Sequence, residues 1–118
     1  MNTKQRTINE SLKVLDRSFH FKENVIKFSR HESFSHFLAK CLYAYELSQN
    51  GILFYTEVIF TKGKLRADLF VPFWNKAIEI ISTETKESIE KKKKDYPVDI
   101  IFVKADDVLR QNKVGIEK

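Results

Sequence analysis

The sequence contains a single cysteine, two prolines and three glycines. One cysteine excludes a disulfide within the chain and a zinc site built on several cysteines. No glycine-rich phosphate loop, Gly-x-Ser-x-Gly motif or Cys/His metal spacing is present, which argues against the protein classes built on them. No apolar run approaches the roughly 18 to 20 residues that span a bilayer, and the first residues are polar. We therefore expect a cytoplasmic protein without a membrane span.

Basic and aromatic residues are plentiful by comparison. The chain has 118 residues, 21 Lys and Arg against 16 Asp and Glu, a net charge of +5, and ten phenylalanines. This length fits one domain with one core. The basic balance favours polyanionic partners such as nucleic acid or anionic membrane surfaces, although solvation alone also accounts for it.

The first third of the chain has a mixed pattern. Apolar residues recur at helical spacing from Ile8 to Phe19, and apolar and polar residues then alternate up to Phe28, as in a short hairpin. We divide the chain into an N-terminal extension, residues 1–32, with a helix and this hairpin, and an α/β domain, residues 33–118.

A regular pattern begins at Ser33, a suitable helix N-cap, and ends at Asn50 and Gly51, where the chain can leave a helix. The intervening apolar residues follow helical spacing. The predicted buried stripe of this helix is Phe34, Phe37, Leu38, Cys41, Leu42 and Tyr45.

Short β-branched and aromatic runs follow, separated by turn residues. Together with the first helix they predict the order α-β-β-β-α-β. The predicted elements are strands at 52–60, 65–71 and 77–81, a helix from Thr83 or Thr85 to about Asp95, a strand at 98–103 and a short last helix in the charged tail.

Three acidic residues interrupt these strands: Glu57, Asp68 and Glu79. Burying a carboxylate without a partner costs several kcal/mol, so each interruption needs a reason. Neighbouring strands can bring the three together, and a hard divalent cation such as Mg²⁺ would relieve their repulsion. Alternatively, Asp68 pairs with Arg66 or a lysine, Glu57 faces solvent and Glu79 bonds a helix terminus.

This arrangement resembles the restriction-endonuclease-like, PD-(D/E)XK nuclease superfamily, whose core has the same order of elements. Arg66-Ala67-Asp68 and Ile78-Glu79-Ile80-Ile81 match its Asp and Glu-x-Lys strands, as in archaeal Holliday-junction resolvases. Competence-protein-type nucleases are similar over a further opening motif, matched here by Glu32, Ser33, His36 and Lys40.

The resemblance implies a mixed sheet flanked by helices and a catalytic site. Asp68 and Glu79 would hold Mg²⁺ or Mn²⁺ with help from Glu57, while His36 and Lys40 would border the site or contact phosphate. Strand alternation places Ile81 where the family has lysine, and Lys40 or Lys86 are candidates for a relocated lysine. Without one, the fold would be inactive.

His36 and Lys40 share one helix face, opposite the predicted apolar stripe. They therefore face solvent unless the N-terminal segment or a second subunit covers them. Lys91, Lys92, Lys93 and Lys94 are consecutive on a helix, so at least one should face the sheet. With Arg66 they are candidate DNA phosphate contacts, the alternative for the lysines being simple solubility.

We predict a metal-dependent deoxyribonuclease that hydrolyses phosphodiester bonds and forms a homodimer. One alternative is a catalytically inactive nuclease-fold protein that binds DNA or a protein partner without needing metal. A small interaction domain with no nucleic-acid role is the third possibility.

Overall fold

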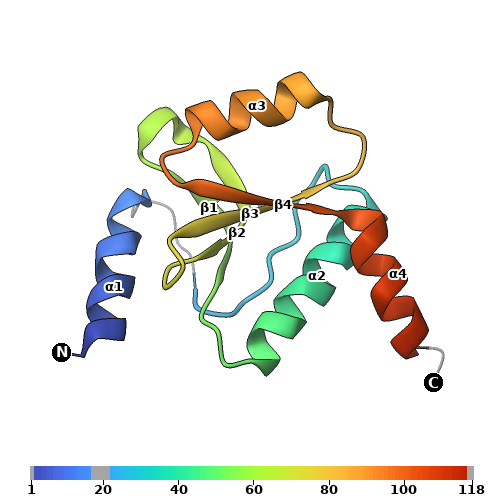
Figure 1. Cartoon of the computed structure of the whole chain (residues 1–118), viewed down its shortest axis with the longest axis horizontal. Helices are drawn as coiled ribbons and strands as arrows, with labels where there is room; N and C mark the ends of the chain where they lie inside the picture. Colours follow the sequence, from blue (N-terminus) through green and yellow to red (C-terminus); the bar gives the residue numbers. More distant parts are fainter. Residues whose placement is uncertain (1, 17–21, 117–118) are drawn as a thin grey trace.

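The computed structural model describes residues 2–16 and 22–116, with side chains up to residue 110 (Figure 1). Its order of elements from α2 to β4 is the predicted α-β-β-β-α-β. The helices are α1 (Thr3–Ser11), α2 (Phe34–Gln49), α3 (Lys86–Asp95) and α4 (Ala105–Ile116), with short 3-10 turns at Leu12–Val14 and Lys62–Lys64; the strands are β1 (Tyr55–Ile59), β2 (Arg66–Val71), β3 (Lys76–Ile81) and β4 (Asp99–Lys104).

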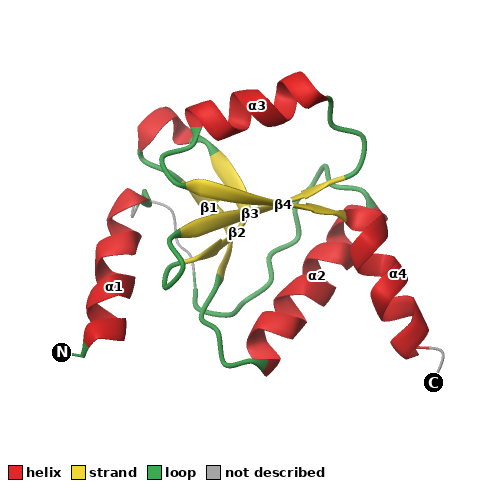
Figure 2. Cartoon of the chain, viewed as in Figure 1, coloured by secondary structure: helices red, strands yellow, loops and turns green. Residues whose placement is uncertain are grey.

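The four strands form one mixed sheet in the order β1-β2-β3-β4 (Figure 2). β1 pairs with β2 and β2 with β3 in antiparallel fashion, whereas β3 and β4 are parallel. Parallel neighbours need a crossover connection, and α3 supplies it. The chain is thus an α/β protein, as predicted.

Helices cover both faces of this sheet. α2 and α4 pack on one face, and α3 crosses the other (Figure 1). The apolar cluster on the α2 side includes Ala44, Leu47 and Leu69. The cluster on the α3 side includes Phe70 and Tyr96. β2, β3 and β4 therefore present apolar side chains to both layers, which explains the nearly continuous apolar runs of β2 and β3.

The bounds of α2 agree with the prediction, but its predicted buried stripe is wrong at both ends, whereas Leu42 within it packs against the α2-side cluster. Ser33 caps the helix, accepting a hydrogen bond from His36 N at 3.1 Å. Phe34 and Tyr45 are 76% and 60% exposed. α2 buries two alanines, one lysine and only one large apolar residue, because small residues let the helix approach the strands closely: Ala39, Lys40, Ala44 and Leu47.

The N-terminal extension runs beside the free edge of β1. Asp16 N donates to Ile59 O at 2.8 Å, and Asn24 N donates to Phe54 O at 2.8 Å. An exposed strand edge can pair with other chains, so this covering protects it. Of the predicted hairpin, Phe19 lies outside the described residues, and the segment around Phe28 is irregular rather than a strand.

The last helix, α4, extends over 12 residues and is longer than the short helix predicted for the tail. It packs beside α2 on the same face of the sheet (Figure 1). Among the described helices, none has the length and apolar character needed to cross a membrane.

Candidate functional site

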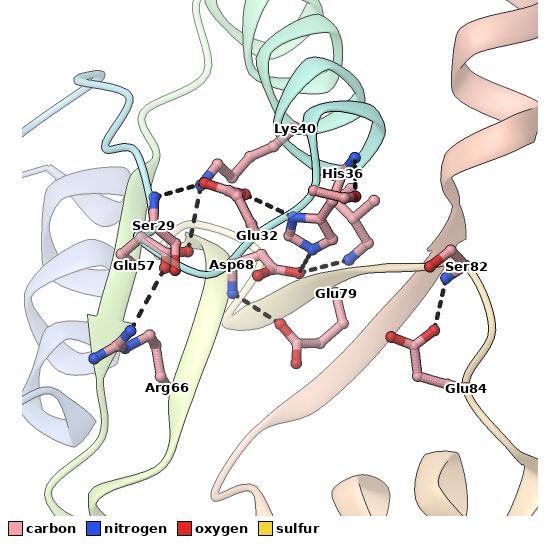
Figure 3. A network of polar contacts seen from close by, with 12 residues as sticks. Ser29, Glu32, His36, Lys40, Glu57, Arg66, Asp68, Glu79, Ser82 and Glu84 are labelled. Atoms are coloured by element: carbon pink, nitrogen blue, oxygen red, sulfur yellow. Dashed lines mark hydrogen bonds and ion pairs between the residues drawn. The ribbon is translucent and has the colours of Figure 1, made fainter.

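A cluster of ionisable side chains lies between the start of α2 and the sheet (Figure 3). It brings together residues from four separate segments of the chain. The sequence analysis named them as site residues or as part of the resemblance that implied the site: Glu32, His36, Lys40, Glu57, Asp68 and Glu79.

His36 bridges two carboxylates in this cluster. Its Nδ1 lies 2.6 Å from Glu32 Oε1, and its Nε2 lies 3.2 Å from Asp68 Oδ2. A carboxylate can only accept, so both ring nitrogens carry protons in this arrangement. The bond and charge of Asp68, followed by those of Glu32, raise the pKa of His36 to about 9 despite partial burial. His36 is therefore a cation at neutral pH.

Lys40 is completely buried one helical turn further along α2. Its Nζ donates to Glu32 Oε2 at 2.9 Å and to Lys27 O at 2.8 Å, and lies 3.6 Å from Glu57 Oε2. The segment that contains Lys27 and Glu32 thus covers this face of α2. The sequence analysis predicted that this face would be exposed unless the N-terminal segment or a second subunit covered it, and the N-terminal segment does so. A lysine without exposed surface holds carboxylates in place and does not reach a substrate.

Glu57 combines backbone strain with an unsatisfied carboxylate. Its φ angle is 49°, a left-handed conformation that non-glycine residues seldom adopt within a strand. Its side chain is 10% exposed, and its buried Oε2 has no hydrogen-bond partner among the described residues. Burial raises the pKa of Glu57. The alternative in which Glu57 simply faces solvent is wrong.

Asp68 and Glu79 replace backbone hydrogen bonds between β2 and β3. The antiparallel pairing extends only as far as Leu69 and Ile78. Beyond that point Asp68 N donates to Glu79 Oε2 at 2.8 Å, and Ile80 N donates to Asp68 Oδ2 at 2.8 Å (Figure 3). The two acids hold the strands together where the backbone pairing stops.

The two carboxylates face different layers of the fold. Asp68 meets His36 of α2, whereas Glu79 Oε1 lies 2.7 Å from the hydroxyl of Tyr96 and 3.3 Å from Lys92 Nζ of α3. Burial, followed by the charge of Asp68, raises the pKa of Glu79 to about 7. Glu79 therefore titrates near neutrality.

Tyr96 is a residue of this site that the sequence analysis missed. Its hydroxyl also lies 2.6 Å from Arg66 O, so it links β2 to β3 beneath the cluster. Burial and the charge of Glu79 raise its pKa. Nothing in the sequence around Tyr96, which follows the lysine run and precedes Pro97, distinguishes it from an ordinary core tyrosine.

The other predicted cations lie at different depths. Lys92 faces the sheet, as expected for at least one lysine of the run, while Lys91 pairs with Asp95 on the exposed side of α3. Arg66 is 58% exposed, with Nη1 3.9 Å from Glu57 Oε1. Lys86 is exposed, and no hydrogen bond or ion pair connects it to the cluster in the described part of the chain. Lys93 and Lys94 are exposed.

Ile81 occupies the position expected for lysine and is buried, 8% exposed. A separate cavity of about 540 Å³ lies between α2, α4 and the β2–β3 turn. Residues such as Tyr43 and Trp74 line it, and none of the clustered carboxylates does. The cluster is therefore separate from this cavity and is positioned by the start of α2.

Comparison with protein-family models, curated proteins and solved structures finds no match to this chain. The functional argument therefore depends on the geometry of the cluster.

Proposed function

We propose that this chain is a metal-dependent nuclease of restriction-endonuclease-like fold, in which Glu57 and Asp68 hold a divalent cation. The order of elements, the mixed sheet and the clustering of the six acidic and basic residues support the proposal. The observation that supports the proposal most directly is the strained backbone and unsatisfied carboxylate oxygen of Glu57.

The backbone strain and the unsatisfied oxygen of Glu57 are costs that its two ion pairs only partly offset. A left-handed residue in a strand costs of order 1–3 kcal/mol, and a desolvated carboxylate oxygen without a hydrogen bond costs about as much again. Lys40, 3.6 Å from Oε2, and Arg66, 3.9 Å from Oε1, balance the charge of Glu57, but neither makes a hydrogen bond to it. Strain and unsatisfied polar atoms concentrate at functional sites because function maintains them.

The oxygen atoms suit Mg²⁺ or Mn²⁺. Asp68 Oδ2 accepts from Ile80 N and faces His36, which leaves Oδ1 without a hydrogen bond from the described residues. β1–β2 pairing on either side places Glu57 opposite Asp68. Among the described residues no three acidic, histidine or cysteine side chains form a closed metal site. Mg²⁺ commonly uses one or two carboxylates together with water and substrate phosphate, so two carboxylates suffice.

When bound, the cation would polarise the scissile phosphate and lower the pKa of a water molecule. Of the two cations that α2 contributes to the cluster, His36 is the better placed to stabilise negative charge on the phosphate, because its side chain is 19% exposed and Lys40 has no exposed surface. Arg66 adds an exposed guanidinium beside Glu57. In this proposal Glu79 holds the backbone of Asp68 in place by accepting the hydrogen bond from Asp68 N. That Glu79 is itself a metal ligand stays a prediction from the sequence.

A cleavage assay tests the proposal. Purified protein is incubated with labelled single-stranded, duplex and branched DNA, with Mg²⁺, with Mn²⁺ or with chelator. We expect cleavage that requires the cation and is lost in Asp68→Asn and Glu57→Gln. The matched control is Asp99→Asn, an exposed carboxylate at the start of β4, which should cleave normally. Equal cleavage by Asp68→Asn and the control would contradict the assignment.

A catalytically inactive nuclease-fold protein is the second candidate. The burial of Ile81 at the expected lysine position and the inaccessibility of Lys40 favour it. In that case DNA binding persists in chelator, and no DNA is cleaved with either cation. The same assay, read with binding measured alongside cleavage, distinguishes the two candidates.

A further inference from the structure

Two exposed phenylalanines lie on either side of the segment that carries Glu32. Phe28 is 67% exposed and Phe34 is 76% exposed. Aromatic side chains gain free energy by burial, so two such residues beside a polar site indicate a surface that is covered when the protein acts.

Phe37 connects this pair to the ionic cluster. The rings of Phe28 and Phe37 meet edge to face, with centroids 5.0 Å apart. Phe34 and Phe37 are three residues apart on α2 and therefore adjacent on its surface. Lys40 Nζ lies 5.5 Å from the Phe37 ring centroid. We call Phe28, Phe34 and Phe37 the aromatic shelf; it is continuous with the cluster through Lys40.

A tight turn within the same segment presents two basic side chains. Glu32 N donates to Ser29 O at 3.2 Å, which leaves Arg30 and His31 at the two exposed corners. Glu32 points inward, its carboxylate occupied by His36 and Lys40. The exposed part of the turn is therefore basic, whereas its acid is neutralised inside the fold.

Exposed aromatic rings together with basic side chains suit unpaired nucleotides. Bases stack on aromatic rings in single strands, and each phosphate attracts an adjacent cation. In a duplex the base faces are already stacked and unavailable. A second copy of this chain could also cover the shelf, but a two-fold contact there would bring the Arg30 guanidinium groups of the two copies toward each other, which is unfavourable.

We propose that the aromatic shelf binds single-stranded nucleic acid, with unpaired bases on Phe28 and Phe34 and backbone phosphates at Arg30 and His31. The strand would then pass beside Asp68. The binding part of this inference is independent of catalysis; only the identification of the bound strand as substrate rests on the proposed nuclease function.

Fluorescence anisotropy with a labelled oligothymidylate of about 12 nucleotides, in chelator, measures binding without cleavage. We expect Phe28→Ala and Phe34→Ala each to weaken binding about tenfold, the usual scale for loss of one stacked base. Tyr45→Ala is the matched control, because Tyr45 is 60% exposed on the same helix about 16 Å away. It should bind like wild type, and circular dichroism should confirm that all three variants are folded.

Two further measurements sharpen the test. A hairpin duplex of equal length should bind more weakly and be insensitive to Phe34→Ala. Arg30→Ala should lower the slope of log affinity against log salt by about one phosphate contact. Equal affinity of wild type, Phe28→Ala and Phe34→Ala for the single strand would overturn the inference.

Light scattering across protein concentrations addresses the competing occupant. If Phe34→Ala converts a dimer to a monomer while single-strand affinity is unchanged, the shelf is a self-association surface and the inference is wrong. Failure of this inference is distinct from failure of the nuclease proposal. Cleavage together with binding that is insensitive to the shelf variants contradicts only this inference, and shelf-dependent binding without cleavage contradicts only the nuclease assignment.

Discussion

The two ends of α2 meet the same sheet in opposite ways. At its C-terminal end Ala44 and Leu47 pack on apolar strand residues. At its N-terminal end His36 and Lys40 meet carboxylates from the N-terminal segment and from β1 and β2. The C-terminal end of α2 stabilises the fold through the burial of apolar side chains. Apolar residues of similar volume often replace buried ion pairs at little cost, so stability alone does not explain the charges at the polar end.

The largest effect should follow from breaking the polar end. Lys40→Met removes the cation and leaves Glu32 and Glu57 as buried carboxylates near each other. Loss of one partner of a buried pair typically costs about 3–5 kcal/mol, and we expect a decrease of that size in the free energy of unfolding. Urea denaturation measures it. The double variant with Glu32→Gln should recover part of the loss, and a decrease below about 1 kcal/mol for Lys40→Met alone would contradict this account.

The apolar end should respond differently. Leu47→Ala removes a side chain that is 4% exposed and should reduce the free energy of unfolding by about 3 kcal/mol through lost burial and a cavity. Because no titratable group of the cluster changes, the loss should be the same at pH 6 and pH 9. A loss that varied strongly with pH would show that the two ends are coupled.

The pH dependence of stability should come from the polar end. The pKa of His36 is raised from 6.5 to about 9, so its contribution is complete below pH 6.5 and is lost as pH rises through 9; the limit is about 3 kcal/mol. The pKa of Glu79 is raised from 4.5 to about 7, so stability also falls between these values as its charge forms. In urea denaturation at a series of pH values, His36→Gln should reduce the change in the free energy of unfolding between about pH 6.5 and 9. Glu79→Gln should reduce the change between about pH 4.5 and 7. An unchanged pH dependence would refute these assignments.

A smaller effect of opposite sign is expected at Glu57. Glu57→Gly relieves the left-handed backbone and removes the unsatisfied carboxylate, so in the absence of divalent cation it should raise the free energy of unfolding by about 1 kcal/mol. Asn75→Gly, in the β2–β3 turn with φ 53°, is the matched control. It should gain less, since asparagine tolerates this conformation. A clear loss of stability in Glu57→Gly would mean that the glutamate has a structural role.

The sequence predicted the element order because turn residues and strand-like runs are local signals. It failed on the buried face of α2, because large apolar residues such as Phe34 dominate a periodicity argument, whereas close approach to the sheet selects Ala39 and Ala44. The acids were found as interruptions of apolar strands. Tyr96 and the left-handed backbone of Glu57 have no local signal. Tyr96 joins the site through contacts with β2 and β3, and the strain at Glu57 arises within β1, where it pairs with β2.

Calorimetric titration of Mn²⁺, with Mg²⁺ as competitor, tests the central claim that Glu57 and Asp68 hold a divalent cation. We predict binding to wild type and to Asp99→Asn, and loss of binding in Glu57→Gln and in Asp68→Asn. Binding that survives both substitutions, or no binding by wild type, would contradict the claim.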